Sequence, residues 1–199
     1  MADTRGASVN DVCLAALAQA FRRWRLENTG GSRSCPDLSA LVPMSTRLID
    51  ERLAPGNRLV SHHLLLPCSA DRFADALDGV HRQTNAVRAG RTRDSARVAL
   101  AALTPRLGES VADRTTAPEG AQIVASSVTF PGEVACAGAR LTAASLMCDP
   151  YNGRLSYISF ARTTDVVRCT AVYDEVLAHA AAIPSHWKAA LIAEDTPRS

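Results

Sequence analysis

Apolar residues recur at helical spacing near the amino end of the chain and predict a first helix. Ser8 can cap its first free amides, and Asp11 at the third helical position completes a capping box. The helix ends at the glycine pair of NTGGSRS. The apolar side chains form one stripe along the helix, and arginines lie on the opposite side. The stripe consists of Val9, Cys13, Ala16, Leu17, Ala20, Phe21 and Trp24.

Shorter apolar segments follow this helix. Residues 38–47 and 57–66 are predicted to form buried strands, because each is a short apolar run bounded by turn residues. A further helix is predicted over residues 69–89, with Ser69 as its capping residue. Residues 92–114 are again helical in pattern, and Pro105 should kink or split this segment because proline lacks the amide hydrogen that a helix needs.

A strand pattern dominates the next part of the chain. Strands are predicted over residues 121–130, 139–148, 154–161 and 165–172. The sequence DPYNG at 149–153 predicts a hairpin loop, because Asp-Pro starts a turn and Asn-Gly tolerates positive φ. A closing helix is predicted over 173–182, and a short amphipathic helix begins at Pro184.

The order of these elements predicts the fold class. Helix, strands, helices, strands and helix in succession indicate an α+β protein with a mixed sheet and helices packed on one face. A chain of 199 residues is long enough for one well-packed domain. We expect this domain over residues 8–194, with flexible ends at 1–7 and 195–199.

Composition excludes several function classes. The formal net charge is only +2, which gives no electrostatic reason to expect nucleic acid or a membrane surface as the main partner. No run of 18 apolar residues predicts a membrane span, and the first residues lack the pattern of a signal peptide. Six scattered cysteines show no zinc-ligand spacing. We therefore expect a cytoplasmic protein with no metal site and with reduced, mostly buried thiols.

Five short motifs follow one another between residues 8 and 160. They are SVNDV at 8–12, VPMSTR at 42–47, Gly56-Asn57 before a strand that ends in Leu66-Pro67, SSVTFPG at 126–132 and NGRLSYISF at 152–160. In this order they resemble motifs in the C-terminal half of bacterial wax ester synthase/diacylglycerol acyltransferases. The resemblance implies half of a chloramphenicol-acetyltransferase-like fold, in which two such halves enclose a tunnel. Acyl-CoA or another acyl donor would be a co-substrate there, and no further cofactor is expected.

The chain also departs from the family pattern. The family's catalytic His-His-x-x-x-Asp-Gly lies in the other half, and HHLLLPC at 62–68 has Pro67-Cys68 where Asp-Gly would be needed. Ser127 replaces the asparagine of Ser-Asn-Val, and Phe160 replaces the tyrosine of a Ser-Tyr pair. These differences argue against standard CoA-dependent esterification by this chain alone.

His62 and His63 are the candidate catalytic residues. Neighbours on a strand face opposite sides of the sheet, so both cannot point into one pocket without a bulge. One interpretation is a structural pair, each histidine with its own hydrogen-bond partner. The other is that one histidine lines the remaining tunnel and acts as general base on a hydroxyl or an amine near neutral pH. The sequence leaves open which histidine that is.

Further candidates come from the motifs and from one basic stretch. The candidate substrate-binding residues are Asn10, Asp11, Asn57, Ser126 and Ser127. For the first two a structural role at the helix start is the favoured interpretation. The two serines could bond a ligand, although no nucleophile elbow surrounds them. Candidate anion-binding residues are Arg88, Arg91 and Arg93, which could hold the phosphates of CoA or simply form a solvated helix junction.

Three functions from different classes fit these features. The first is a stand-alone half domain that catalyses acyl transfer, condensation or a related step on a small, specialised metabolite, with a pocket formed by self-association. The second is a non-catalytic partner of a separately encoded N-terminal half, which an exposed apolar face would favour. The third is a ligand-binding module that has lost its chemistry. We favour the first, because the core-forming pattern is complete within this chain.

Overall fold

The computed structural model describes residues 6–30, 34–51, 58–90, 92–115, 120–130, 132–150 and 153–195. Two of the predicted site residues, Asn57 and Arg91, lie outside the described residues, as does the side chain of Arg93. Most of the predicted flexible ends (residues 1–5 and 196–199) and part of the predicted hairpin loop (residues 151–152) also lie outside them, whereas Ala7 is buried and Asp195 ends the last helix.

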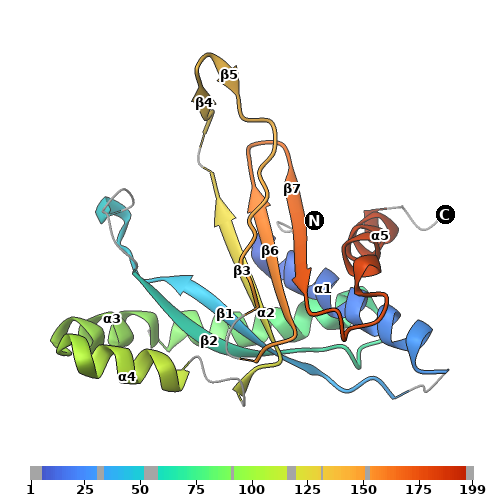
Figure 1. Ribbon diagram of the computed structural model, residues 1–199, viewed down its shortest axis with the longest axis horizontal. Helices are drawn as coiled ribbons and strands as arrows, with labels where there is room; N and C mark the ends of the chain where they lie inside the picture. The colour runs from blue at the N-terminus through green and yellow to red at the C-terminus, as the bar shows by residue number, and fades with distance from the viewer. Residues whose placement is uncertain are drawn as a thin grey trace.

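One five-stranded sheet organises the chain (Figure 1), with the strand order β2-β1-β3-β6-β7. Its strands are β1 (Leu38–Ser45), β2 (Leu59–Leu66), β3 (Ile123–Thr129), β6 (Ser156–Arg162) and β7 (Val167–Tyr173). A separate two-stranded hairpin consists of β4 (Ala135–Cys136) and β5 (Ala139–Arg140). The helices are α1 (Val9–Asn28), α2 (Phe73–Ala89), α3 (Thr92–Ala102), α4 (Pro105–Thr115) and α5 (Ile183–Asp195), with 3₁₀ turns at Ile49–Glu51 and Ala180–Ala182.

The sheet is mixed, as predicted. The β1–β2 and β6–β7 pairs are antiparallel, whereas β3 runs parallel to both β1 and β6. The helices α1, α2 and α5 pack together on one face of the sheet, which we call the inner face. The opposite, outer face is the one seen in Figure 1, with α1 behind the strands. The predicted α+β fold is therefore confirmed.

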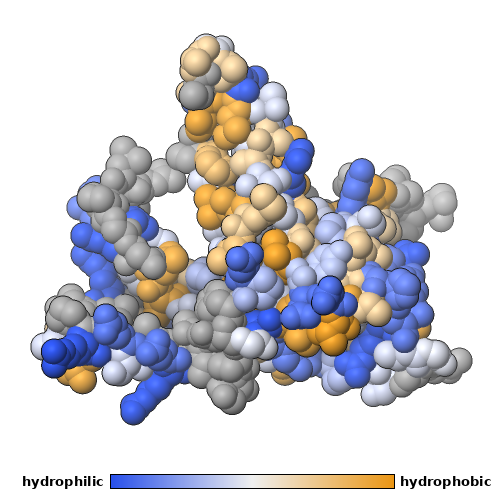
Figure 2. Space-filling view, in the orientation of Figure 1, coloured by the Kyte–Doolittle hydropathy of each residue, from blue (hydrophilic) through white to orange (hydrophobic). Residues whose placement is uncertain are grey.

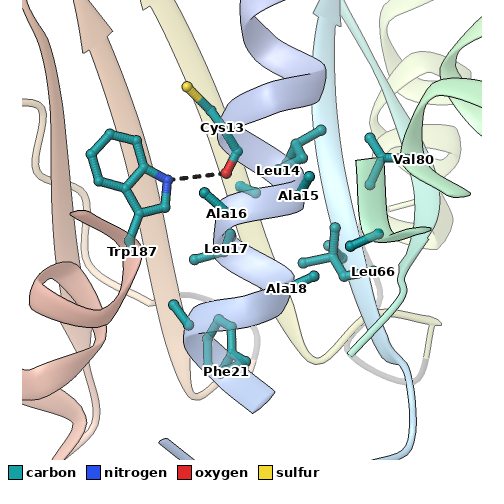
Figure 3. Close-up of a cluster of buried hydrophobic side chains, with 14 of the residues drawn as sticks. Cys13, Leu14, Ala15, Ala16, Leu17, Ala18, Phe21, Leu66, Val80 and Trp187 are labelled. Carbon is teal, nitrogen blue, oxygen red and sulfur yellow. Dashed lines mark hydrogen bonds between the residues drawn. The ribbon is translucent and has the colours of Figure 1, made fainter. Parts of the chain in front are cut away.

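The middle of α1 forms the centre of the core. Its five consecutive residues from Leu14 to Ala18 are fully buried, because the helix is flanked by α2 and α5 and backed by the sheet (Figure 3). From α5, the indole Nε1–H of Trp187 donates a hydrogen bond to the Cys13 carbonyl over 3.0 Å. The same indole stacks on Phe160 of β6, with ring centroids 5.7 Å apart. Helix α5 is thus tied to both α1 and the sheet.

Local signals in the sequence predicted several boundaries of helices correctly. Both hydrogen bonds of the Ser8–Asp11 capping box are present at the start of α1. The helical segment after residue 91 is split at Pro105 into α3 and α4. The start predicted for α2 was wrong: Ser69 lies in a turn, where its amide donates to Asp37, and the helix begins at Phe73.

Two predicted elements differ from the structure. Of the strand predicted over 139–148 only Ala139–Arg140 forms, as β5 in the hairpin with β4, and residues 141–150 form no strand. Instead they cross the outer face, where the Ser159 hydroxyl donates to the Leu146 carbonyl over 2.7 Å. The helix predicted over 173–182 was also wrong. Strand β7 continues to Tyr173, which pairs with Ser156, and His179 has left-handed backbone dihedrals.

The cysteines and the membrane prediction can be compared with the structure directly. Cys13, Cys35 and Cys68 are buried, and Cys148 is exposed. Burial raises the pKa of the Cys13 and Cys68 thiols to about 12, so both are protonated and inert. Within the described residues, none of the helices combines the length and the apolar character that a membrane span requires.

Candidate functional site

Three motif segments that are far apart in the sequence meet at one cavity, at the amino end of α1. This α1 cavity has a volume of about 210 Å³. Its lining comes from α1, β3, β6 and β7 and consists of Ser8, Val9, Asn10, Cys13, Ser127, Thr129, Phe160, Arg162 and Val167. The parallel pairing of β3 with β6 sets Ser127 opposite Phe160 and Thr129 opposite Arg162. Two predicted substrate-binding residues, Asn10 and Ser127, are therefore brought together.

Polar side chains with free hydrogen-bonding capacity line the α1 cavity. Among the described residues, the side chains of Asn10, Ser127, Thr129 and Arg162 have no hydrogen-bond or ion-pair partner. The lining contains one cationic group and no carboxylate. The rest of the lining is apolar and consists of Val9, Cys13, Phe160 and Val167. Such a mixture of an apolar wall and a few polar groups is typical of a small-molecule site.

Asp11, in contrast, faces α2. Its carboxylate is fully buried, and Oδ2 accepts the Ser8 amide over 2.8 Å and lies 3.2 Å from His81 Nδ1. Asn85 bonds the other ring nitrogen of His81 over 2.8 Å. Burial would raise the pKa of Asp11, but hydrogen bonds from Ser8, His81 and Thr84 outweigh it and hold this pKa below its usual value. Asp11 thus joins α1 to α2.

Arg88 belongs to the same network. Its guanidinium donates to Asn85 Oδ1 over 2.9 Å and to Ser8 Oγ over 3.2 Å, and it lies 3.5 Å from the Asp11 carboxylate. These contacts connect the end of α2 to the capping residues of α1. Binding of an external anion by Arg88 would have to compete with them.

His63 lies on the outer face, opposite Leu41 in the β1–β2 register, and is exposed. Its Nδ1 is 2.9 Å from the Gly120 carbonyl, which also accepts the Ser39 hydroxyl over 2.7 Å. Because a carbonyl only accepts, Nδ1 must carry the hydrogen of this bond. In the neutral imidazole, Nε2 then keeps its lone pair. This is the tautomer that a general base at Nε2 requires.

Gly120 allows this close approach. A Cβ atom at position 120 would lie 2.6 Å from Cε1 of His63, which is closer than atoms can approach. The absence of a side chain at this position therefore helps to determine where the imidazole lies.

His62 faces the other way, as the strand alternation predicts. It lies on the same face of β2 as the buried Leu64 and Leu66, and its Nε2 is buried with no hydrogen-bond partner among the described residues. Burial lowers the pKa of His62, and the neighbouring His63 lowers it further. A protonated His62 is therefore disfavoured in the folded protein.

In the His62→Leu variant, the free energy of unfolding is expected to fall less in acid than it does in the wild type. As the pH falls below 6.5, the unfolded chain takes up a proton at this histidine before the folded chain does, so the wild type loses stability. Leucine does not titrate, so the variant lacks this pH dependence. At pH 7.5 the free energies of unfolding of the wild type and the variant should differ by less than about 1.5 kcal/mol. Urea unfolding at pH 7.5 and 5.5 measures both effects. An unchanged pH dependence would contradict the assignment.

The two candidate serines do not share a site. Ser127 faces the α1 cavity, whereas Ser126 is on the outer face, paired in register with Ser159. Sequence reasoning missed Thr129 and Arg162 as cavity residues. The alternation along β3 could have indicated Thr129, two residues after Ser127. Nothing local indicates Arg162, because its place depends on the register between β3 and β6.

The fold is that of one half of the chloramphenicol-acetyltransferase-like and condensation-domain proteins. The wax ester synthase/diacylglycerol acyltransferase from Marinobacter aquaeolei VT8 superposes with a TM-score of 0.64 and 18% identity, over 96% of this chain and 43% of that one. The first condensation domain of the CDA synthetase gives a TM-score of 0.59 and 19% identity, over 100% and 41% of the two chains.

A third similar structure is the X-domain in its complex with OxyB from teicoplanin biosynthesis. It has a TM-score of 0.52 and 17% identity, over 98% of this chain and 42% of the other. The chain therefore spans less than half of each solved structure. No family model matches the sequence, and no curated protein matches it.

Proposed function

We propose that this chain is an acyltransferase-like half domain that catalyses an acyl-transfer, condensation or related step on a small metabolite. His63 would act as the general base, removing a proton from the attacking hydroxyl or amine of the acceptor. An acyl-CoA or another acyl donor would be the co-substrate. The folds of the three similar structures support the class of reaction.

The observation that carries this proposal is the contact between His63 and Gly120. The carbonyl holds the imidazole in one orientation and one tautomer, with Nε2 left for a substrate proton. His62 has no such arrangement, because its free nitrogen is buried.

A second half is expected to cover the site. The outer-face side chains Leu59, Leu65 and Val128 are 45%, 49% and 38% exposed, on the same side of the sheet as His63. Figure 2 views this face and shows hydrophobic side chains over the central strands and the β4–β5 hairpin. Exposed apolar surface of this kind marks a contact surface. We propose that a second copy of the chain covers it and excludes water from the reaction.

The same apolar surface favours a second candidate function. A separately encoded half that carries His-His-x-x-x-Asp-Gly could occupy this face and supply the catalytic histidine itself. This chain would then be a non-catalytic partner subunit. The two functions differ in whether the purified chain is active alone.

Light scattering combined with an activity assay tests the proposal. The purified chain is measured from about 1 to 100 μM, and thiol release from acetyl-CoA and hexanoyl-CoA is followed with a panel of small alcohols and amines. We expect thiol release to rise together with the associated fraction of the chain. A chain that stays monomeric and releases no thiol above the spontaneous rate would contradict the proposal. Activity that appears only after co-expression with an N-terminal half would establish the second candidate.

A further inference from the structure

We infer that the α1 cavity binds a small organic carboxylate, with Arg162 as its ion-pair partner and the apolar wall around its hydrocarbon body. This inference rests on the proposed function only for the role of the bound acid as a substrate or product. Binding itself needs neither His63 nor a second half of the fold.

Charge is the first argument. Arg162 lines the cavity and has no acidic partner among the described residues, whereas some arginines are paired: Arg22 with Asp71, Arg23 with Glu27, Arg58 with Glu51 and Arg140 with Asp165. Unlike the other arginines without an acidic partner in the described part of the chain, Arg162 lines this cavity. Asp11, the acid next to the lining residue Asn10 in the sequence, is buried toward α2 and held by His81. Asp165, three residues after Arg162, pairs with Arg140. The planar guanidinium matches a carboxylate through two parallel hydrogen bonds. An anion from outside would therefore meet an unopposed and geometrically suited cation.

Additional hydrogen-bond donors lie around the same space. The Asn10 amide and the hydroxyls of Ser127 and Thr129 line the cavity and have no protein partner in the described part of the chain. The capping box already uses the Asp11 amide. That amide is therefore not available to a ligand, and these side chains supply polar contacts for it. A carboxylate has about four lone-pair sites, so it can accept bonds from the guanidinium and from these groups together.

The cavity's size and its apolar wall restrict the ligand further. At about 30 Å³ for each water in the liquid, a volume of about 210 Å³ holds roughly seven waters. A short acid of about ten non-hydrogen atoms or fewer is therefore expected. Phe160, Val9 and Val167 would contact its hydrocarbon part. Inorganic phosphate has no such part and would leave the apolar wall exposed to water.

The structure contains its own reporter for binding. Trp187 stacks on Phe160, and its indole donates to the Cys13 carbonyl, so two cavity-lining residues contact this one tryptophan. The other tryptophan, Trp24, bonds the Ala178 carbonyl and does not line the cavity. In a Trp24→Phe background, a ligand in the cavity should change the fluorescence of Trp187 alone.

The experiment titrates hexanoate and benzoate into this Trp24→Phe protein, with hexanamide, benzamide and inorganic phosphate as comparison compounds. We expect saturable fluorescence changes with the two acids only. Arg162→Gln should weaken binding by at least about tenfold, and Arg162→Lys by less, since lysine keeps the charge without the two-pronged geometry. Arg168→Gln is the matched control, because Arg168 is an exposed arginine on the neighbouring strand that lies outside the cavity lining.

Several results would overturn the inference. Amides that bind as well as the acids would show that charge is not recognised, and phosphate binding equally well would show that the apolar wall plays no part. Equal losses in Arg162→Gln and Arg168→Gln would indicate a diffuse charge effect. Absence of a saturable signal up to about 20 mM acid in the Trp24→Phe protein and in isothermal titration of the wild type would also refute it. All of these measurements report binding without catalysis. They can therefore be distinguished from a failure of the proposed activity.

Discussion

Asp11→Ala is expected to lower the free energy of unfolding by about 3 kcal/mol or more. The carboxylate is fully buried, and its removal leaves the Ser8 amide and His81 without this acceptor and takes away one of the partners of Arg88. The variant also lacks half of the capping box at the start of α1, the helix at the centre of the core. Loss of the cap alone would cost about 1 kcal/mol, so the larger effect comes from the unpaired groups between α1 and α2.

Urea unfolding followed by circular dichroism measures this change, and Asp71→Ala serves as the control. Asp71 pairs with Arg22 but is 81% exposed, so its removal should change stability little. If both substitutions have equally small effects, the network between α1 and α2 is not a stabilising element.

The Asp11→Asn variant isolates the charge of Asp11. The folded pKa of this carboxyl lies below its usual 3.8, so the charge contributes its full stabilisation above pH 3.8. That contribution is lost as the pH falls through the folded pKa. The difference in stability between wild type and Asp11→Asn should therefore be constant from pH 7 to 5 and narrow below 3.8. A difference that does not narrow in acid would show that shape, rather than charge, determines the effect.

His63→Ala is expected to reduce kcat/KM by about 10²- to 10⁴-fold in the thiol-release assay, the usual contribution of a general base. His63→Gln should lose as much, because its amide can still donate to the Gly120 carbonyl but has no basic nitrogen. The His62→Leu variant is the matched control, since that side chain lies on the inner face. Equal losses at both positions would indicate a structural pair and contradict the assignment of the base.

Gly120→Ala separates the position of the imidazole from its chemistry. The added methyl group would lie 2.6 Å from Cε1 of His63, so the ring must move. A shift of about 1 Å can cost about 10²-fold in rate, with KM affected less than kcat. Thermal unfolding of each variant monitors folding. Full activity in Gly120→Ala would show that the observed orientation of His63 is not the reactive one.

Much of the fold could be predicted because its signals are local. The capping box spans four residues, and Pro105 interrupts a helix without any help from distant contacts. The failures occurred where distant contacts override local pattern. Residues 141–148 belong to a predicted strand, yet they cross the outer face, where the Leu146 carbonyl accepts the Ser159 hydroxyl. Residues 173–182 favour a helix by composition, but Tyr173 is held in β7 by its pairing with Ser156.

The candidate site divides in the same way. The sequence by itself determined that His62 and His63 face opposite sides, because alternation is a property of any strand. It also determined the role of Ser8 and Asp11 at the start of α1. Only the tertiary structure decided that His63 is the histidine held by Gly120, and that Asn10, Ser127 and Arg162 surround one cavity. Those residues meet because β3 pairs in parallel with β6 and α1 packs across both, and each of these contacts depends on segments far apart in the chain.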